Sequence, residues 1–422
     1  MRNLLYLIFI LTFPILLFSQ DTITSQNIIS YRSSIIIESN SLNIDFVNRL
    51  FFGGYIKNSQ KSDWISKLDE KNILFSEISN KISFSKKFNK NTILLSLTDR
   101  NLARMSFTDD LMKIILLGNY NFQDETINFN NTNFTLNRFQ QIKFGYERTF
   151  NVNQNDLIFK TAFSYLNGNH HLSFVSEKGS FYTASYGLYN ELEYDIDAFA
   201  TDTSNFNFFE NNGNGTTFDF FVSYKTSDKK FTIYLSDLGY INWKESAFKY
   251  FTDTSFSFYG IVIDDLLEFN DSIIDAESDK FLEDIYINAK KGRKKSYIPA
   301  DFGFSIELLL QDNFFKKYTT GINLRWQPHR DNNNLSIDKV LQGYCESDYS
   351  PYFYIRAFKE IKYFLIMPQI AIGGYTKKFN LGITTIIGKK LPLQIELNHL
   401  ENIFKGNQSQ ALSVYLQISK GF

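Results

Sequence analysis

Cysteine, proline and net charge are all scarce in this sequence of 422 residues. The single cysteine, Cys345, cannot form an internal disulfide, lies in a polar stretch predicted to be an exposed loop, and is assigned no role. The six prolines suit long strands, because proline cannot donate a hydrogen bond to a strand ladder. A formal net charge of −1 at pH 7 gives no indication of a nucleic-acid partner.

Long apolar runs are missing beyond residue 18. A membrane protein built from helices would show uninterrupted apolar stretches of about 18 residues or more, so that class is excluded for the rest of the chain. The mean hydropathy of −0.24 does not exclude a membrane β-barrel. Only alternate residues of a barrel strand meet lipid, and the average hides them.

Catalytic and cofactor-binding motifs are absent as well. The sequence has no phosphate-binding loop, dinucleotide fingerprint, cysteine cluster or Gly-x-Ser-x-Gly turn. His170 and His171 would point to opposite faces of a strand, which makes them poor joint ligands for a metal ion. A serine paired with His399 is conceivable but has no supporting motif. We therefore predict no enzyme activity, no metal site and no cofactor.

Aromatic residues are abundant: 44 Phe, 25 Tyr and 3 Trp make up 17% of the chain. Aromatic side chains favour strands and form the girdles of membrane barrels. Many segments also place apolar residues at every second position, which is the side-chain period of a β-strand. These segments are 82–88, 92–98, 142–146, 157–165, 192–198, 218–224, 231–235, 302–310, 318–326, 352–358, 364–372, 379–387 and 391–397.

The final stretch, ALSVYLQISKGF, alternates almost without interruption. Its apolar face consists of Leu412, Val414, Leu416, Ile418 and Phe422. The stretch resembles the closing strand of outer-membrane β-barrels, and the resemblance implies an assembly signal for the barrel-insertion machinery. Lys420 departs from the pattern, because such strands usually carry an apolar residue there. The alternative is an amphipathic closing strand of a soluble β-sandwich.

The N-terminal residues favour export. Arg2 precedes an apolar run over residues 4–18, and Ser19 and Gln20 are polar. This arrangement is typical of a secretory signal peptide, here over residues 1–20 and cleaved near Gln20. Residues 21–422 are then expected to form a single domain in the outer membrane. The predicted fold is all-β: a transmembrane antiparallel β-barrel of about 14 strands, within about 12 to 18.

Several segments depart from the strand pattern. Residues 108–117 predict a short helix with Thr108 as its N-cap and Gly118 at its end. Residues 278–291 predict a second helix. Both inserts are expected to lie at a rim or to narrow the lumen. Residues 42–56 predict a strand bent or bulged at Gly53 and Gly54, and residues 21–40 predict either an early strand or a segment inside the barrel.

The connections between the predicted strands alternate in length. Residues 311–317, 359–362 and 388–390 are short connections, whereas 264–299, 327–351 and 398–410 are long. Short periplasmic turns and long external loops are the rule for outer-membrane barrels. The short connection at 375–378 breaks the alternation, and the sequence NNGNG at 211–215 predicts a loop.

Four carboxylates share one face of the predicted strand 192–198. They are Glu191, Glu193, Asp195 and Asp197. In a barrel wall this face would be the lumen, with a negative charge at every step of about 6 to 7 Å. Such a row could select cations or bind Ca²⁺. The alternative is an ordinary solvated strand face.

Four longer stretches of the sequence resemble a single known family. They are FTIYLSDLGYINW at 231–243, FSFYG at 256–260, IDDLL at 263–267 and YIPAD at 297–301. These stretches are similar to an uncharacterised family of Bacteroidota outer-membrane barrels, the domain of unknown function family 5723. The resemblance covers most of the mature chain. It implies the barrel fold and the outer-membrane location, but no activity and no functional residues.

The sequence therefore predicts an outer-membrane barrel that acts as a channel or transporter for a small or lipophilic solute. The alternative is a non-conducting barrel that scaffolds a surface or secretion complex. Outer-membrane lipid and the barrel-insertion machinery are the expected partners, together with that complex in the second case. No nucleic acid is expected.

Overall fold

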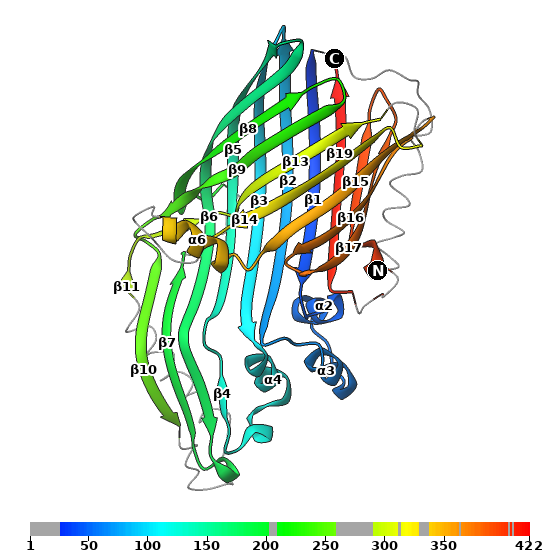
Figure 1. The fold of residues 1–422 in the computed structure, drawn as a ribbon. Helices are drawn as coiled ribbons and strands as arrows, with labels where there is room; N and C mark the ends of the chain where they lie inside the picture. The colour runs from blue at the N-terminus through cyan, green and yellow to red at the C-terminus, as the bar shows by residue number, and fades with distance from the viewer. Residues whose placement is uncertain are drawn as a thin grey trace.

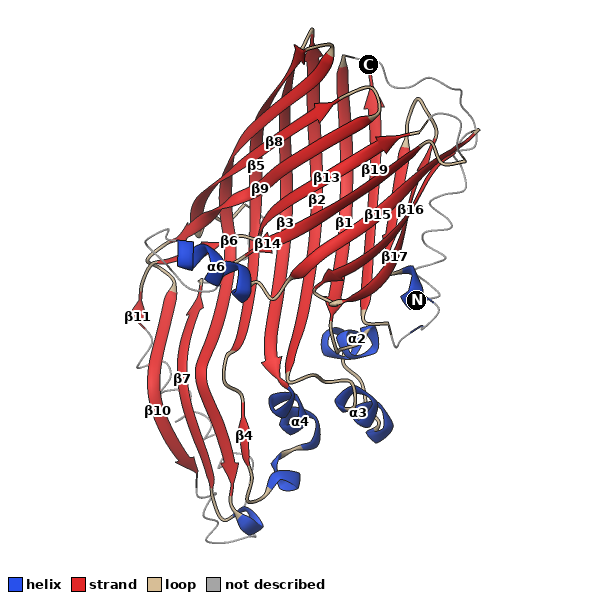
Figure 2. Cartoon of the chain, in the orientation of Figure 1, coloured by secondary structure: helices blue, strands red, loops and turns tan. Residues whose placement is uncertain are grey.

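Fourteen strands of the chain close into one antiparallel β-barrel (Figure 1, Figure 2). The structure is a computed structural model that describes residues 26–201, 209–258, 290–310, 314–328, 337–362, 364–403, 406 and 409–422. The barrel strands, in order around the ring, are β1 (Asn27–Ser39), β2 (Lys71–Phe88), β3 (Asn91–Thr108), β5 (Thr132–Val152), β6 (Asn155–Thr183), β8 (Gly213–Lys225), β9 (Lys229–Trp243), β13 (Ala300–Leu309), β14 (Lys317–Trp326), β15 (Ser350–Ile361), β16 (Phe364–Gly374), β17 (Lys378–Ile387), β18 (Leu393–Asn398) and β19 (Ala411–Gly421).

Pairing between the first and last strands closes the ring. β1 pairs antiparallel with β19 over its whole length, from Ile28 opposite Gly421 to Glu38 opposite Ala411, and it pairs with β2 on its other side. A closed ring leaves no strand edge unpaired, which is the condition for a sheet to sit in a bilayer. The predicted fold class and approximate strand number are confirmed, and residues 27–39 form a barrel strand.

The outward face of the barrel is apolar. Large apolar side chains on many strands are between about two fifths and two thirds exposed, among them Ile82, Leu97, Phe144, Phe163, Ile233, Ile355, Ile370 and Phe379. Exposed apolar surface that continues around a barrel is stable against lipid and costly against water. The closing strand follows the same pattern: Tyr415 lines an interior cavity, so the alternate residues Leu412, Val414, Leu416 and Ile418 face outward.

The two ends of the barrel differ in the length of their connections. At one end the strands are joined by the short connections 89–90, 153–154, 226–228, 310–316, 362–363 and 388–392, and both Asn27 and Phe422 lie there. The other end carries the long connections, with the predicted exception of the three-residue turn 375–377. The predicted loop at 211–215 is wrong in part, because Gly213 begins β8.

A sheet projects beyond the barrel at the long-connection end (Figure 1). β6 has 29 residues; its first part pairs with β8 in the barrel, and its last part pairs with β7 (Asn190–Ala200) and β4 (Thr126–Asn128). β7 pairs in turn with β10 (Phe248–Phe258), which is followed by β11 (Lys290–Lys291), while β12 (Lys294–Tyr297) pairs with β9. We call β4, β7, β10, β11 and the last part of β6 the projecting sheet.

Helices cluster at the same end. They are α2 (Ile44–Phe52), α3 (Asn58–Ile65), α4 (Asp109–Leu117), α6 (Ile337–Glu346) and α7 (Leu400–Ile403), with short 3₁₀ turns η1 (Asn119–Phe122) and η2 (Ser185–Gly187). Within the described ranges, no helix is long and apolar enough to cross a bilayer. The predicted helix at 278–291 lies outside the described residues, except for β11.

The strand predicted at 42–56 is wrong, because α2 forms there. The Asn43 side chain accepts a hydrogen bond from the backbone N–H of Phe46 at 2.9 Å, and Gly53, at φ 69°, ends the helix. An N-cap and a glycine stop together favour a helix over a bulged strand. The prediction for α4 is confirmed, since Thr108 accepts from the N–H of Leu111 and the helix ends at Gly118.

Candidate functional site in the barrel lumen

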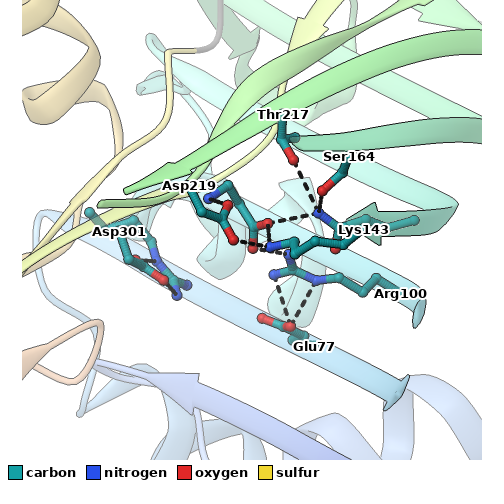
Figure 3. A network of polar contacts seen from close by, with 10 residues as sticks. Glu77, Arg100, Lys143, Ser164, Thr217, Asp219 and Asp301 are labelled. Carbon is teal, nitrogen blue, oxygen red and sulfur yellow. Dashed lines mark hydrogen bonds and ion pairs between the residues drawn. The ribbon is translucent and has the colours of Figure 1, made fainter. Parts of the chain in front are cut away.

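Five charged side chains from different strands meet in the barrel lumen and form a layer that we call the neck. They are Glu77 on β2, Arg100 on β3, Lys143 on β5, Asp219 on β8 and Asp237 on β9. Figure 3 shows four of them reaching toward one another from the surrounding strands. Because β5, β6 and β8 separate β3 from β9 in the wall, a contact between β3 and β9 crosses the lumen.

Asp237 is the centre of the neck. One carboxylate oxygen accepts from Arg100 Nη1 at 3.0 Å, and the other accepts from Lys143 Nζ at 2.9 Å and from Gln141 Nε2 at 2.8 Å. Arg100 also contacts Glu77 at 3.0 Å, and Lys143 also binds Asp219. These bonds tie β9 to β3 and β5 across the interior.

A β-bulge turns Asp237 inward. The pairing of β8 with β9 shifts between Phe218 and Phe220, so that Ser236 and Asp237 together oppose the single residue Asp219. Asp237 takes φ 57°, a left-handed conformation that aspartate tolerates better than most residues, and its N–H donates to Asp219 at 2.8 Å. The bulge therefore positions the group on which the neck depends.

Buried apolar side chains fill the lumen beside the neck, on its long-connection side. We call this cluster the apolar plug: Ile73, Phe75, Leu102, Phe139, Leu166, Phe199, Ile241, Trp243, Ala247, Ile298 and Tyr375. Phe75 stacks on Tyr375 with ring centroids 4.3 Å apart, although one lies on β2 and the other between β16 and β17. Side chains of the wall and its connections therefore narrow the lumen.

Of the two places expected for the helix at 108–117, a rim or the lumen, α4 takes the rim and does not narrow the lumen. That helix packs through Met112 and Leu116 against Leu42, Trp64 and Phe107, in a separate apolar cluster at the rim. An amphipathic helix buries its apolar stripe wherever a matching surface is nearest. Here that surface is formed by the neighbouring rim segments.

A cavity of about 440 Å³ lies in the lumen along the wall from β13 to β19. Five tyrosines line it, namely Tyr234, Tyr349, Tyr352, Tyr354 and Tyr415. Amide side chains such as Asn323 and Gln369 add further hydrogen-bonding groups, and the Gln369 amide donates to the Tyr352 hydroxyl at 2.9 Å. We call this space the lumen cavity. Its wall offers hydrogen bonds and aromatic faces, with little purely aliphatic surface.

The charges around the lumen cavity are paired. Arg325 donates to Asp301 through two nitrogens at 2.7 and 2.9 Å, and Lys317 lies 2.9 Å from Glu307. His399 lies 3.2 Å from Glu38, and Arg356 lies 3.9 Å from Glu396. Because each positive group has a carboxylate beside it, the cavity presents dipoles to a solute and has no strong field of one sign.

The four carboxylates predicted to line the lumen lie elsewhere. Glu191, Glu193, Asp195 and Asp197 are on β7, which pairs with β6 and β10 in the projecting sheet and takes no place in the barrel ring. Asp197 lies 3.5 Å from Lys294, and Glu191 and Glu193 are exposed. The prediction of a row of charge in the barrel wall is therefore wrong, because alternation identifies a strand and says nothing about its partners.

His171 and His399, two of the described histidines, lie far apart and have different partners. His171 stacks on Trp243 at 5.0 Å and its Nδ1 lies 2.7 Å from the Asn137 side-chain oxygen. Both ring nitrogens of His399 face carboxylates, Glu38 at 3.2 Å and Glu401 at 3.5 Å, rather than a serine. In the described part of the chain, no three His, Cys, Asp or Glu side chains are arranged to hold a metal ion.

His399 lies in the connection after β18, where its carboxylate neighbours change its titration. Burial alone would lower the pKa of the imidazole, but the hydrogen bonds with Glu38 and Glu401 outweigh burial and raise the pKa to about 9. A group whose pKa is higher in the folded state stabilises that state below its unfolded pKa of about 6.5. The contribution is then lost as the pH rises through about 9.

We expect the barrel to lose about 3 kcal/mol of stability between about pH 6.5 and pH 9 because of His399. His399→Gln should lack this component and should be less stable than the wild type at pH 6. Thermal unfolding of both proteins in detergent at several pH values measures the difference. Parallel pH profiles for the two proteins would contradict the expectation.

The sequence patterns do not predict Asp237, Arg100 or the tyrosines of the lumen cavity as interior groups. A signal was present for Asp237, because it lies within the stretch at 231–243 that carries the family resemblance. For Arg100 the signal was weaker: a charged residue in the interior of a strand is unusual on a lipid face and therefore indicates the lumen face.

The closed ring and the apolar outer face define a membrane-spanning β-barrel. The chain belongs to the Family of unknown function (DUF5723), whose family profile matches residues 11–350. The family predicted from the sequence is thereby confirmed, while an origin in Bacteroidota stays a prediction. No curated protein sequence matches the chain.

Several solved barrels are similar over most of their length. A ΔS2S3 mutant of the TodX monoaromatic hydrocarbon channel has 8% identity and a TM-score of 0.45, over 94% of this chain and 91% of that chain. The Ralstonia pickettii toluene transporter TbuX has 9% identity and a TM-score of 0.44, over 94% and 90%. A Pseudomonas aeruginosa FadL homologue has 10% identity and a TM-score of 0.39, over 93% and 88%.

Proposed function

We propose that the protein is an outer-membrane channel for small polar solutes without net charge, and that the neck controls passage. The observation that carries the proposal is the lumen cavity, a space of about 440 Å³ inside a closed barrel, lined by tyrosines, amides and paired charges. We also propose that a signal peptide directs export of the chain and that the closing strand directs its assembly into the membrane.

The lining of the lumen cavity favours a polar solute over a lipophilic one. Tyrosine hydroxyls and amide groups lose hydrogen bonds to water when an apolar molecule covers them, which costs free energy. Paired charges attract neither anions nor cations strongly. A small uncharged or zwitterionic molecule can replace the lost water contacts and is therefore the solute class that the cavity fits best.

The direct test is solute flux into proteoliposomes that contain the purified protein, measured by swelling in a neutral sugar or amino acid. Thr319 lines the lumen cavity, and Thr320, the next residue, is exposed on the outer face. We expect Thr319→Trp to reduce flux several-fold and Thr320→Trp to leave it unchanged. Equal flux through both variants would contradict the assignment of the cavity to the solute path.

Selectivity gives a further prediction. Lys317→Gln removes the positive partner of Glu307 and leaves a carboxylate uncompensated in the lumen cavity. The reversal potential in a salt gradient should then shift toward cations, because a fixed negative charge favours them. The control is Lys316→Gln, which removes the neighbouring, exposed lysine that pairs with Glu360 at 3.2 Å. A shift of the same size in the control would contradict the prediction.

The projecting sheet favours a second function, a scaffold for a surface complex. The sheet extends past the barrel end, and its tip exposes Tyr186 by 93% and Leu188 by 67%. Exposed apolar groups at a tip suit contact with another protein. A wild-type protein and a neck variant that both stay closed in planar bilayers would favour the scaffold and contradict the channel.

A further inference from the structure

A second cavity, of about 670 Å³, lies at the long-connection end of the barrel. β3, β5 and β6 contribute Ser106, Asn133 and Val175. The start of α4 contributes Asp110, and the end of α6 contributes Glu346. This space shares no lining residue with the lumen cavity. We call it the vestibule pocket.

Ser106 and Asn133 place the vestibule pocket over the interior of the barrel. Ser106 lies opposite Asn133 in the pairing of β3 with β5, and Asn133 lies opposite Val175 in the pairing of β5 with β6. Alternate residues of a strand share a face, so Ser106 is on the same face as Arg100, which reaches into the neck. A ligand in this pocket would therefore sit at the mouth of the lumen.

Two buried oxygens in this pocket have no hydrogen-bond partner. Ser106 is 0% exposed and Asn133 is 7% exposed, and neither the Ser106 hydroxyl nor the Asn133 side-chain oxygen is bonded. Asn133 does use its amide nitrogen, which donates to the carbonyl of Asn131 at 3.4 Å. Buried polar atoms are nearly always bonded, and leaving one unbonded costs free energy. A ligand that donates hydrogen bonds here would recover that cost.

The other groups around the vestibule pocket set the chemistry of the ligand. Glu70, Asp110 and Glu346 are hydrogen-bond acceptors when ionised, whereas Phe107 and Val175 are apolar. Asp109 and Lys71 also line the pocket, and Lys71 lies 2.5 Å from Asp348, so the carboxylates outnumber the cation and would repel an anion. A ligand with many hydroxyl donors and an apolar ring face satisfies both kinds of surface, and the volume lies within the range of about 300 to 1,000 Å³ found for small-molecule sites.

We propose that the vestibule pocket binds a neutral saccharide, with Ser106 and Asn133 accepting hydrogen bonds from its hydroxyl groups. Both oxygens are covered in this structure, so binding as proposed requires the side chains around them to move. The proposal does not depend on conduction, since the pocket lies outside the lumen cavity.

The test uses the full-length protein in detergent and neutral trisaccharides such as maltotriose, cellotriose and mannotriose as probes. Saturation-transfer NMR and titration calorimetry measure binding to the wild type, to Ser106→Ala, and to the double variant Ser106→Ala/Asn133→Leu. We expect at least one trisaccharide to bind the wild type, with affinity reduced about tenfold or more in the double variant. Ser106→Ala alone should fold as well as the wild type, because its hydroxyl is unbonded.

Thr183→Val is the matched control. Thr183 is also buried with an unbonded hydroxyl, but it does not line the vestibule pocket. Circular dichroism and heat-modifiable migration in gels confirm that each variant is folded. Three outcomes would overturn the proposal. No trisaccharide binds the wild type, or the folded Ser106→Ala and double variants bind as tightly as the wild type. The third is that the protein binds spermidine and none of the saccharides.

Discussion

Asp237→Ala is expected to lower the free energy of unfolding by about 3 to 5 kcal/mol and to increase ion conductance. The substitution removes the carboxylate shared by Arg100 and Lys143, two partly buried cations at 3.0 and 2.9 Å. The loss is that of two charge-assisted hydrogen bonds, each worth about 1.5 to 3 kcal/mol. Arg100 keeps Glu77 and Lys143 keeps Asp219, so we expect the barrel still to fold.

Two measurements check this prediction. Thermal unfolding in detergent gives the stability, and planar bilayers give the conductance of the same preparation. The control is Glu360→Ala, which removes an exposed carboxylate from a surface pair at the short-connection end. Surface pairs contribute about 0 to 1 kcal/mol, so the control should resemble the wild type. An unchanged conductance in a destabilised Asp237→Ala barrel would mean that the neck braces the barrel without closing the lumen.

Trp243→Ala is expected to cost about 3 to 5 kcal/mol of stability, the range for replacing a buried Trp or Phe by alanine. Trp243 is 1% exposed, its indole N–H donates to the Ser296 hydroxyl at 2.8 Å, and its ring stacks on His171. The substitution leaves a cavity in the apolar plug and an unbonded hydroxyl next to it. We therefore also expect larger solutes to pass than in the wild type.

The control for Trp243→Ala is Phe52→Ala at the end of α2. Phe52 is 86% exposed, so its removal opens no cavity and should change stability by less than about 0.5 kcal/mol. Unfolding midpoints of the two variants in the same detergent give the comparison, and liposome swelling with sugars of increasing size gives the effect on passage. Equal midpoints for both variants would show that the apolar plug adds nothing to barrel stability.

The neck and the apolar plug together form a layer of side chains, from the wall and its connections, that narrows the lumen. Within this layer, the bulge at Asp237 interrupts the pairing of β8 with β9, while the rest of the ladder stays regular. The lumen cavity lies beside this layer and the vestibule pocket lies beyond it.

Most of the fold could be predicted from local sequence. Strands such as β13, β14 and β19 alternate almost without interruption, and their connections alternate in length, as is typical of outer-membrane barrels. The helix α4 carries its own cap and stop, Thr108 and Gly118, and was predicted with the correct bounds to within a residue. The helix α2 was missed because the capping role of Asn43 was outweighed by the apolar pattern that follows it.

The candidate site was much harder to predict. Nothing in the local sequence distinguishes Asp237 from the other aspartates, because the shifted pairing of β8 with β9 is what directs it into the lumen. Arg100 pairs with Asp237 because β9 lies across the lumen from β3. The carboxylates on β7 show a different error. Alternation correctly predicts a strand there, but the strand belongs to the projecting sheet and not to the barrel wall. Sites built from distant strands cannot be recognised from spacing along the chain.

The sequence by itself determined that alternate side chains face lipid, that the chain ends in a barrel strand, and that short and long connections mark opposite ends. These features follow from a period of two residues, which is a local property of the backbone. Only the tertiary structure decided which strands form the wall, which project beyond it, and which side chains meet in the lumen. Strand partners and bulges depend on pairing over long distances in the sequence, and that pairing leaves no local signal.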